Sequence, residues 1–223
     1  ETKTNADGTK TVTTTEGNTT TVETKDSEGN TTKTVETVTD EDGSTITETN
    51  ADGSSKVTEK DSDGNVTKET VTNADGSKVV TEKDSDGNVT KETVTNTDGS
   101  KEVTENSYDN EGDKTGSVVT TTSADGKTVT VVEKDASGET TKTTETVTDA
   151  DGTKTVTTTE GNTTTVKTKD SEDNTTKTVE TKTNADGTKT VTTTEGNTTT
   201  VETKDSEGNT TKTVETVTDE DGS

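Results

Sequence analysis

Several side chains on which enzymes and folded domains depend are absent from this sequence. The 223 residues contain no His, Cys, Met, Trp, Phe or Pro, and Tyr108 is the single aromatic residue. Catalytic nucleophiles, acids and bases act from pockets that exclude water and shift their pKa values. Carboxylates are plentiful, but apolar residues make up 15% of the chain and cannot build the walls of such a pocket. We therefore expect a protein that is not an enzyme and that binds no catalytic metal or cofactor.

The apolar content is also too low for a conventional hydrophobic core. A chain of this length normally forms one or two domains, and low hydrophobicity with a formal charge of −25 normally indicates disorder. However, disordered segments are rich in Pro, whereas Thr and Val dominate here. Both are β-branched and favour the pleated surface of a sheet. The composition thus predicts an all-β protein with little conventional core.

Charge and hydropathy also limit the partners. A strongly acidic chain lacks the Lys and Arg excess that nucleic acids and anionic membranes attract, so we expect neither partner. No apolar run has the length of a membrane span or of a signal-peptide core. The absence of Cys fits a protein that does not depend on the redox compartment, and it neither proves nor excludes export.

Repeats are the main feature of the sequence. Residues 1–44 recur without change as residues 180–223, which indicates recent duplication and a window of a longer array. Glycine positions mark a unit of 35 residues near both ends and one of 23 residues in the middle. We expect tandem hairpin repeats over residues 1–105 and 118–223. The stretch 106–117 breaks the period, and we expect an irregular loop there, serving as a connection, a hinge or a contact point.

Each period is punctuated by turn residues. Segments such as Asn5-Ala6-Asp7-Gly8 suit a type I turn, with Gly in the left-handed position that closes a G1 bulge. The opening Asn or Asp is expected to bond backbone amides. In Glu16-Gly17-Asn18, both Gly and Asn suit positive φ. The stretches between turns have strand length and are too short for stable helices.

The turn positions predict a register. If Glu16-Gly17-Asn18 is a three-residue loop, Val12 faces Val22. The same reasoning pairs Val156 with Val166, Val191 with Val201, Val38 with Ile46 across Glu41-Asp42-Gly43, and Val57 with Glu69 across Gly64. The valines then lie on both faces, so that no one-sided core is encoded. We therefore predict tandem β-hairpins that form an elongated antiparallel meander sheet, rather than a sandwich.

Glycans are the most specific modification that the sequence indicates. Asn-x-Thr acceptor triplets lie in or just after turns, at Asn18, Asn30, Asn65, Asn88, Asn162, Asn174, Asn197 and Asn209. Threonine runs suit dense O-linked sugar, and the candidates are Thr13, Thr14, Thr15, Thr19, Thr20 and Thr21. Asn-rich turns followed by Thr-rich strands also produce such triplets by chance.

Two further patterns have competing explanations. Acidic turns such as Asp61-Ser62-Asp63-Gly64 resemble calcium loops, but an EF-hand requires Gly at position 6 rather than 4. Hairpin-turn chemistry explains these residues, which leaves diffuse Ca²⁺ or Mg²⁺ screening of the acidic surface. Regular Thr-x-Thr spacing is similar to the flat Thr arrays of ice-binding proteins, although strand propensity alone produces the same pattern and the intervening Lys and Glu interrupt it.

The Asp/Asn-x-Asp-Gly turn between Thr/Val strands resembles that of tandem β-hairpin repeat proteins of extracellular and cell-surface fibres, including bacterial surface repeats. The resemblance covers nearly the whole chain except residues 106–117. It implies a structural, glycan-coated filament, stalk or adhesin spacer that self-associates into a fibre. Tyr108-Asp109 is the only Tyr-Asp pair, which excludes a close match to Tyr-Asp wrapping repeats. The alternatives are an adhesin or ice-binding repeat that uses its Thr face, and a flexible acidic spacer.

Overall fold

The computed structural model describes residues 1–218 and contains two compact units, which divide between Thr115 and Gly116. The described part of the chain is all-β and contains no helix. Every strand pairing found within the two units is antiparallel and joins strands that are consecutive along the chain. The predicted all-β class and the meander of tandem hairpins are confirmed.

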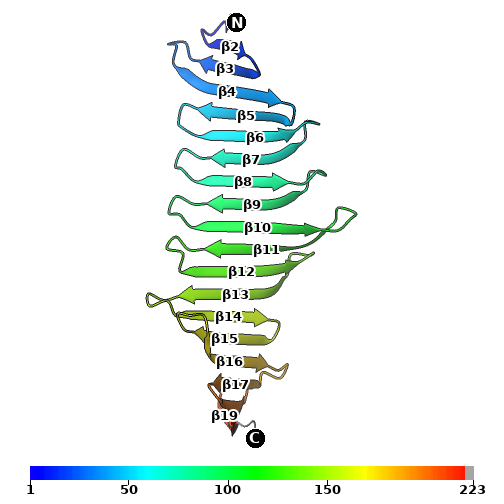
Figure 1. Ribbon diagram of the computed structural model, residues 1–223, viewed down its shortest axis with the longest axis vertical. Coiled ribbons are helices and arrows are strands. Elements are labelled where there is room, and N and C mark those ends of the chain that lie inside the picture. The colour runs from blue at the N-terminus through cyan, green and yellow to red at the C-terminus, as the bar shows by residue number, and fades with distance from the viewer. Residues whose placement is uncertain (219–223) are drawn as a thin grey trace. The chain divides into compact units, whose positions relative to one another are not determined.

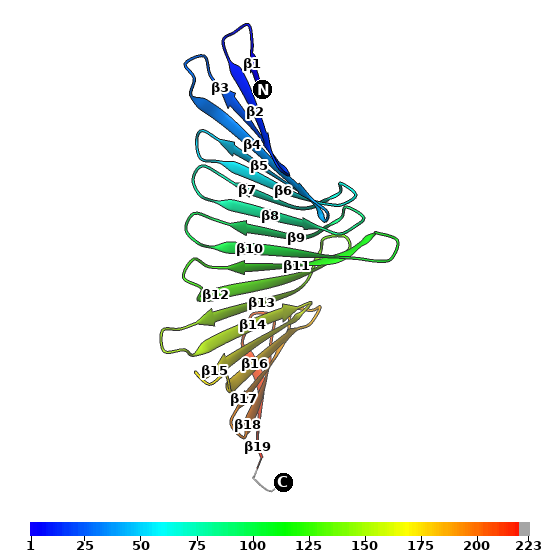
Figure 2. The ribbon, with the colours of Figure 1, turned by 45° about the horizontal axis from the view of Figure 1, so that its top comes forward.

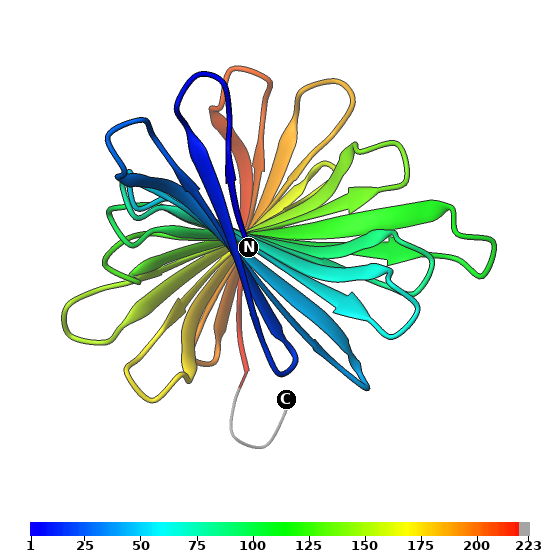
Figure 3. The ribbon, with the colours of Figure 1, turned by 90° about the horizontal axis from the view of Figure 1, so that it is seen from above.

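The first unit is an open sheet whose strands follow chain order (Figure 1). Its strands are β1 (Thr2–Thr4), β2 (Lys10–Glu16), β3 (Thr19–Lys25), β4 (Thr31–Asp40), β5 (Gly43–Asn50), β6 (Ser55–Asp61), β7 (Val66–Thr72), β8 (Lys78–Lys83), β9 (Val89–Thr95) and β10 (Lys101–Tyr108). Seen from above, these strands, coloured blue to green, fan out around the viewing direction (Figure 3). The fan is the cumulative twist that strand sterics impose on an open sheet.

The second unit has the same construction. Its strands are β11 (Lys114–Thr122), β12 (Thr128–Asp135), β13 (Thr140–Thr148), β14 (Lys154–Glu160), β15 (Thr163–Lys169), β16 (Thr175–Thr183), β17 (Lys189–Glu195), β18 (Thr198–Lys204) and β19 (Thr210–Val217). The hairpins of this unit also follow one another in chain order (Figure 2).

Most hairpins close with the predicted type I turn and G1 bulge. Gly8 N–H donates to Asn5 O at 3.1 Å, Asn5 N–H donates to Thr9 O at 2.9 Å, and Gly8 has a φ of +85°. The side-chain bonds differ from the expectation for Asn, because Asn5 Nδ2 donates to the Thr9 hydroxyl and Asp7 Oδ1 accepts the Thr9 N–H. Where Asp opens the turn, as at Asp26, its carboxylate does accept backbone N–H groups.

The second kind of turn contains two residues rather than three, so the predicted register is wrong by one residue. Glu16 pairs directly with Thr19, and only Gly17 has positive φ, at +59°, which defines a type II′ turn. Val22 therefore faces Thr13. The repeats agree: Val12 faces Glu23, Val156 faces Lys167, Val166 faces Thr157, Val191 faces Glu202 and Val201 faces Thr192.

The other two predicted pairs are wrong for related reasons. Asp40 pairs with Gly43 across the two-residue turn Glu41-Asp42, so Val38 faces Thr45 and Ile46 faces Thr37. In the β6–β7 hairpin, a register shift between Glu59 and Lys60 displaces the pairing, and Val57 faces Thr70 rather than Glu69. A bulge places an extra residue on one strand, which turn counting does not detect.

The irregular loop expected at residues 106–117 is much shorter than predicted. Strand β10 continues to Tyr108 and β11 starts at Lys114, and a regular turn lies between them, with Gly112 N–H donating to Asp109 O at 3.2 Å. Asn106 Nδ2 and Tyr108 Oη both donate to Val89 O, at 2.8 and 2.9 Å. Side chains thus hold the end of β10 against β9 beyond the last ladder pair of these two strands, Lys91–Glu105.

No hydrophobic side chain is buried among the described residues, and the most buried polar residue is Ser117 at 7% exposure. Valines lie on both faces and most are half-buried. Val71, which is exposed, Val79 and Val94 form one cross-strand row, while Val80 pairs with Thr70 and Thr93 on the other face. The sheet is therefore stabilised by its ladders, its turns and cross-strand side-chain pairs, each worth roughly 0.2–1 kcal/mol.

Candidate functional site

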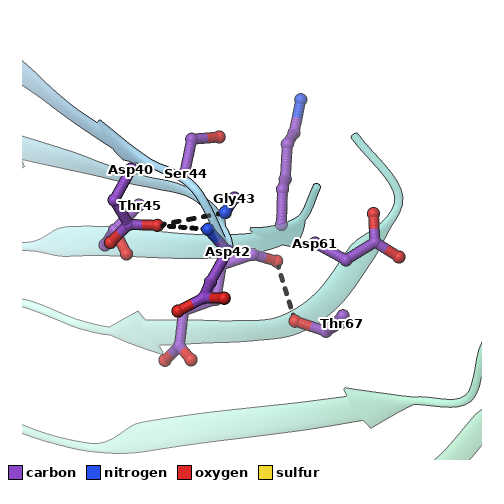
Figure 4. A pocket seen from close by; sticks show the side chains of 9 residues that line it. Asp40, Asp42, Gly43, Ser44, Thr45, Asp61 and Thr67 are labelled. Atoms are coloured by element: carbon purple, nitrogen blue, oxygen red, sulfur yellow. Dashed lines mark hydrogen bonds between the residues drawn. The ribbon is translucent and has the colours of Figure 1, made fainter. Parts of the chain in front are cut away.

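An acidic hollow lies beside the β4–β5 turn (Figure 4). Asp40 Oδ1 accepts the N–H groups of Asp42 and Gly43 at 3.0 and 3.1 Å, and Asp61 and Glu59 lie along the same hollow. Within residues 1–218, no group of three or more acidic side chains is arranged to hold a metal ion. The carboxylate of Asp40 closes the turn, so the hollow needs no ligand to explain it.

A second kind of hollow recurs on the sheet face. In the first unit it is lined by Thr14, Glu16, Thr19, Thr21 and Glu36, and in the second by the equivalent residues Thr158, Glu160, Thr163, Thr165 and Glu180. Two carboxylates and three hydroxyls face solvent in each copy. These polar side chains can bind surface water, and the hollow that they line is open to solvent.

The Thr candidates for O-linked sugar lie on β2 and β3. Thr14 and Thr15 are exposed, whereas Thr13, Thr19, Thr20 and Thr21 are half-buried. Thr15 pairs with Thr20 across the hairpin, and their hydroxyl oxygens lie 3.4 Å apart. The exposed threonines of this set therefore both lie on β2, whereas those on β3 are half-buried.

The Asn candidates fall into two structural classes. Asn30, at the end of an Asp-x-x-Gly turn, donates Nδ2 to Asp26 Oδ2 at 3.0 Å. Equivalent bonds hold Asn65, Asn88, Asn174 and Asn209. Asn18, Asn162 and Asn197 instead lie in Gly-Asn turns; Asn197 Nδ2 donates to Thr218 O at 3.0 Å. All eight are exposed except Asn88, which is half-buried.

The turn bonds also tune the acidic side chains. The pKa of Asp61 is lowered from its ordinary value of 3.8 because the Asn65 side-chain amide and then the Asn65 backbone N–H donate to its carboxylate. The pKa of Asp26 is lowered for the same reason by Asn30. These carboxylates remain charged at neutral pH, which strengthens the turn bonds that they accept.

Sequence reasoning predicts Lys–Glu pairs across strands but does not locate them. One row across β6–β10 alternates in sign, and contains Glu59, Lys68, Glu82, Lys91 and Glu105. In this row Lys68 Nζ lies 3.4 Å from Glu59 Oε1, and Lys91 Nζ lies 2.9 Å from Glu105 Oε1. The bulges in β6–β7 and β8–β9 set the register that places these residues opposite one another. Counting residues from the turns could therefore not locate the row.

Asp173 replaces the Gly found at the equivalent turn position of the other repeats, Gly29 and Gly208. It has a φ of +72°, and its carboxylate lies 3.0 Å from Lys154 Nζ and 3.3 Å from Lys169 Nζ. Lys154 and Lys169 face each other directly across β14–β15. Asp173 thus neutralises a like-charge pair, at the expense of a backbone conformation that favours Gly.

A second difference between the repeats explains why a carboxylate at position 173 is useful in this copy. In the first copy, Glu23 lies 3.2 Å from Lys25 on the same strand. The position equivalent to Glu23 is Lys167 in the middle copy, so Lys169 has no such neighbour there. The change of Glu to Lys and the change of Gly to Asp are therefore electrostatically matched.

The net negative charge is concentrated in the turns. Every lysine in the described chain except Lys127 lies on a strand, where acidic residues are present in almost equal number. Apart from Glu1, the other acidic side chains among residues 1–218 lie in the connecting turns. The strands are therefore nearly neutral, and most of the negative charge of the described residues lies in the turns.

Comparison with known proteins identifies no family. No family model matches the chain, and no curated protein matches it. Among solved structures, the TCP10 domain of Danio rerio CPAP, in complex with a STIL peptide, is 15% identical with a TM-score of 0.33 over 96% of this chain and 98% of that one. A structure of TcdB2-TccC3 is 10% identical with a TM-score of 0.30, over 94% of this chain and 15% of that one. Likenesses this distant carry no functional conclusion.

The structure also bears on membrane insertion. Nothing among residues 1–218 is a helix of the length and apolarity that a membrane crossing needs.

Proposed function

We propose that this chain is a structural, non-catalytic segment of an extracellular or cell-surface fibre, with glycans attached at its turns. The observation that carries the proposal is the strictly local ladder. Within each unit, the described strands pair with their neighbours along the chain, and none of their hydrophobic side chains is buried. An array of this kind lengthens by adding repeats and needs no new core, as in other quasi-one-dimensional repeat proteins.

The charge distribution supports the same function. Nearly neutral strand faces reduce repulsion within the sheet, whereas the acidic turns hydrate the ends of the strands and oppose nonspecific aggregation. Ca²⁺ or Mg²⁺ would act on such a surface as a diffuse counterion rather than at a defined site.

The accessible turns support the glycan assignment. Asn18 and Asn162 lie in exposed two-residue turns, and the structure records no hydrogen bond from either side-chain Nδ2. Asn30 and its equivalents would have to give up or share the bond to the turn Asp. We therefore expect higher sugar occupancy at Asn18 and Asn162 than at Asn30.

Intact-mass and glycopeptide mass spectrometry of material from the native source test this assignment. Sugar at the two-residue turns, in excess over the Asp-bonded class, is the expected result. A bare mass of 23.2 kDa for a 223-residue segment would contradict the glycan coat. Immunogold labelling of the native source tests the location, and label confined to the cell interior would contradict the fibre assignment.

A binding function is the second candidate. Thr143, Thr159, Thr164 and Thr181 form one uninterrupted cross-strand row of hydroxyls over β13–β16. An adhesin or ice-binding repeat would use such a row as its ligand surface. Thermal hysteresis near freezing measures the ice activity, and its absence would remove that alternative. A coil-like circular dichroism spectrum at every concentration would instead favour a flexible acidic spacer.

A further inference from the structure

Two hairpin turns share one backbone conformation but differ in how one carboxylate is bonded. The turns are Asp61–Asn65 (Asp-Ser-Asp-Gly-Asn) and Asp149–Thr153 (Asp-Ala-Asp-Gly-Thr), and in each a second Asp precedes the Gly. The Gly N–H donates to the carbonyl of the opening Asp at 3.0 Å in the first turn and 3.1 Å in the second, and the Gly φ values are +87° and +86°. The backbone therefore gives no reason for the two Asp-Gly pairs to react differently.

The last residue of each turn decides which carboxylate is bonded. Thr153 donates its N–H and its hydroxyl to Asp151 Oδ1, at 3.0 and 2.8 Å. Asn65 instead donates its N–H and its side-chain Nδ2 to the opening Asp61, at 2.8 and 3.1 Å. Asp63 is exposed, and the structure records no hydrogen bond or ion pair from any described residue to its carboxylate.

The same contrast recurs along the described chain. The Asp86 carboxylate is also exposed and without a recorded bond, because Asn88 bonds the opening Asp84. Where Ser or Thr follows the Gly, its N–H and hydroxyl both bond the Asp before the Gly, as at Asp7, Asp52, Asp75, Asp98 and Asp186. Asp125 likewise accepts one hydroxyl and one N–H. Asp42 has no recorded bond to its carboxylate either, but the residue after it belongs to a ladder, so the backbone there is not matched.

We propose that Asp63 and Asp86 are sites of spontaneous isoaspartate formation, and that a Ser or Thr after the Gly protects the turns that contain one. In this reaction the Gly nitrogen bonds to the side-chain carboxyl carbon of the Asp, the nitrogen gives up its proton, and water leaves from the protonated carboxyl group. Water then hydrolyses the resulting succinimide at either carbonyl, which restores Asp or transfers the backbone link to the side-chain carboxyl. The inference concerns the turns alone and does not depend on the proposed fibre function.

The bonds at Asp151 oppose this reaction in two ways. They fix the orientation of the carboxylate, so they must be released before its carbon can rotate onto the Gly152 nitrogen. They also lower the pKa of Asp151, the Thr153 N–H contributing most and the Thr153 hydroxyl next, so that less of the side chain carries the proton that leaves with water. Hydrogen bonds to a charged group are stronger than those between neutral groups, and we expect reaction at a bonded Asp to be roughly tenfold slower.

The product would alter the hairpin that contains it. An isoaspartyl residue adds its Cβ atom to the main chain and so lengthens the turn. The turn at Asp61–Asn65 joins β6 to β7, in which Glu59 lies opposite Lys68, with Nζ 3.4 Å from Oε1. Asp63 and Asp86 both lie in the 23-residue repeats in the middle of the chain, so we expect the change to concentrate there.

Reciprocal substitutions in the full-length chain test the assignment. Asn65→Thr gives the Asp63 turn the last residue of the Asp151 turn, and Thr153→Asn makes the reverse change. Each chain is aged in warm, mildly acidic buffer and digested with trypsin. Isoaspartyl peptides are separated by chromatography from Asp peptides of the same mass, and electron-transfer fragmentation assigns the position.

The repeats supply an internal control for this measurement. Tryptic peptides 61–68 and 84–91 are identical in the parent, and Asn65→Thr gives them different masses. Asp86 is therefore an unchanged reference in the same digest as the altered Asp63 turn. A sample aged in urea, in which the turns are not formed, gives the intrinsic rate at each site. Circular dichroism confirms that each variant folds.

Isoaspartate at Asp63 should form roughly tenfold more slowly in Asn65→Thr than in the parent, while Asp86 is unchanged, and Thr153→Asn should accelerate the reaction at Asp151 by a similar factor. Rates that change by less than about twofold would overturn the proposal. Absence of isoaspartate from the folded parent at both unbonded sites, when the urea sample forms it, would also overturn it.

Ser77→Ala supplies an independent test in another turn. It removes the hydroxyl that donates to Asp75 Oδ1 at 2.7 Å and leaves the backbone N–H of residue 77 in place. We expect faster isoaspartate formation at Asp75, and a rate equal to that of the parent would contradict the protective role of the hydroxyl.

Discussion

Gly43→Ala should weaken the sheet far more than the same change at Gly53. Gly43 has a φ of +145°, and a Cβ atom there would collide with Lys60 O and lie 2.8 Å from the carbonyl carbon of Asp61. Gly53 has a φ of +85°, and a Cβ atom at that position would meet nothing within 4 Å. Comparing the two substitutions thus distinguishes the effect of a steric collision, present only at Gly43, from the effect of backbone strain, present at both positions.

The magnitudes follow from these contacts. A left-handed conformation costs a non-Gly residue about 1–2 kcal/mol, which is the whole expected loss for Gly53→Ala. At Gly43 the backbone must also move by about 1 Å to relieve the collision, which disrupts the pairs Gly43–Asp61 and Ser44–Lys60. Two lost ladder bonds add about 0.5–1.5 kcal/mol each, for a total of about 2–5 kcal/mol.

Urea unfolding followed by circular dichroism measures the two losses, and hydrogen exchange locates them. For Gly43→Ala, we expect faster exchange in β5 and β6 and a broader or biphasic transition, because a weak junction uncouples the blocks of a one-dimensional array. Losses that agree within about 0.5 kcal/mol for the two variants would refute the collision argument.

Three further predictions concern single side chains. Tyr108→Phe should lower the free energy of unfolding by about 0.5–1.5 kcal/mol, because it removes the bond to Val89 O; unchanged amide protection at the start of β9 would contradict this. Asn65→Ala should raise the pKa of Asp61 towards 3.8 in an NMR titration. Because folding lowers the pKa of Asp61, ionisation of this carboxyl stabilises the folded state above pH 3.8, and this stability is lost as the pH falls through the lower folded-state pKa. If the stability of Asn65→Ala depended on acidic pH as that of the parent does, this would be evidence against the turn bond. Asp173→Gly should relax the backbone but expose the repulsion between Lys154 and Lys169, so its stability should improve as salt is raised, more than that of the parent; equal salt dependence would argue against the pairing.

The turns and the strand class could be predicted from local sequence. Asn5–Gly8 and its equivalents contain within four residues the chemistry that closes the hairpin, and the β-branched stretches between them have few alternatives to strands. The repeat identity likewise predicted that the same hairpin would recur, as β2–β3 and β17–β18 do with matching pairs.

The register and the contacts across strands required the tertiary structure. Whether Glu16-Gly17-Asn18 acts as a two- or three-residue loop depends on a single backbone conformation, and that choice reverses which side chains face each other.

Contacts between distant residues are equally invisible to local reasoning. The bonds from Asn106 and Tyr108 to Val89, and those from Asp173 to Lys154 and Lys169, exist only once the strands are aligned. Local chemistry therefore determined where this chain turns. The alignment of the strands, set by turn length and bulges, determined which side chains meet.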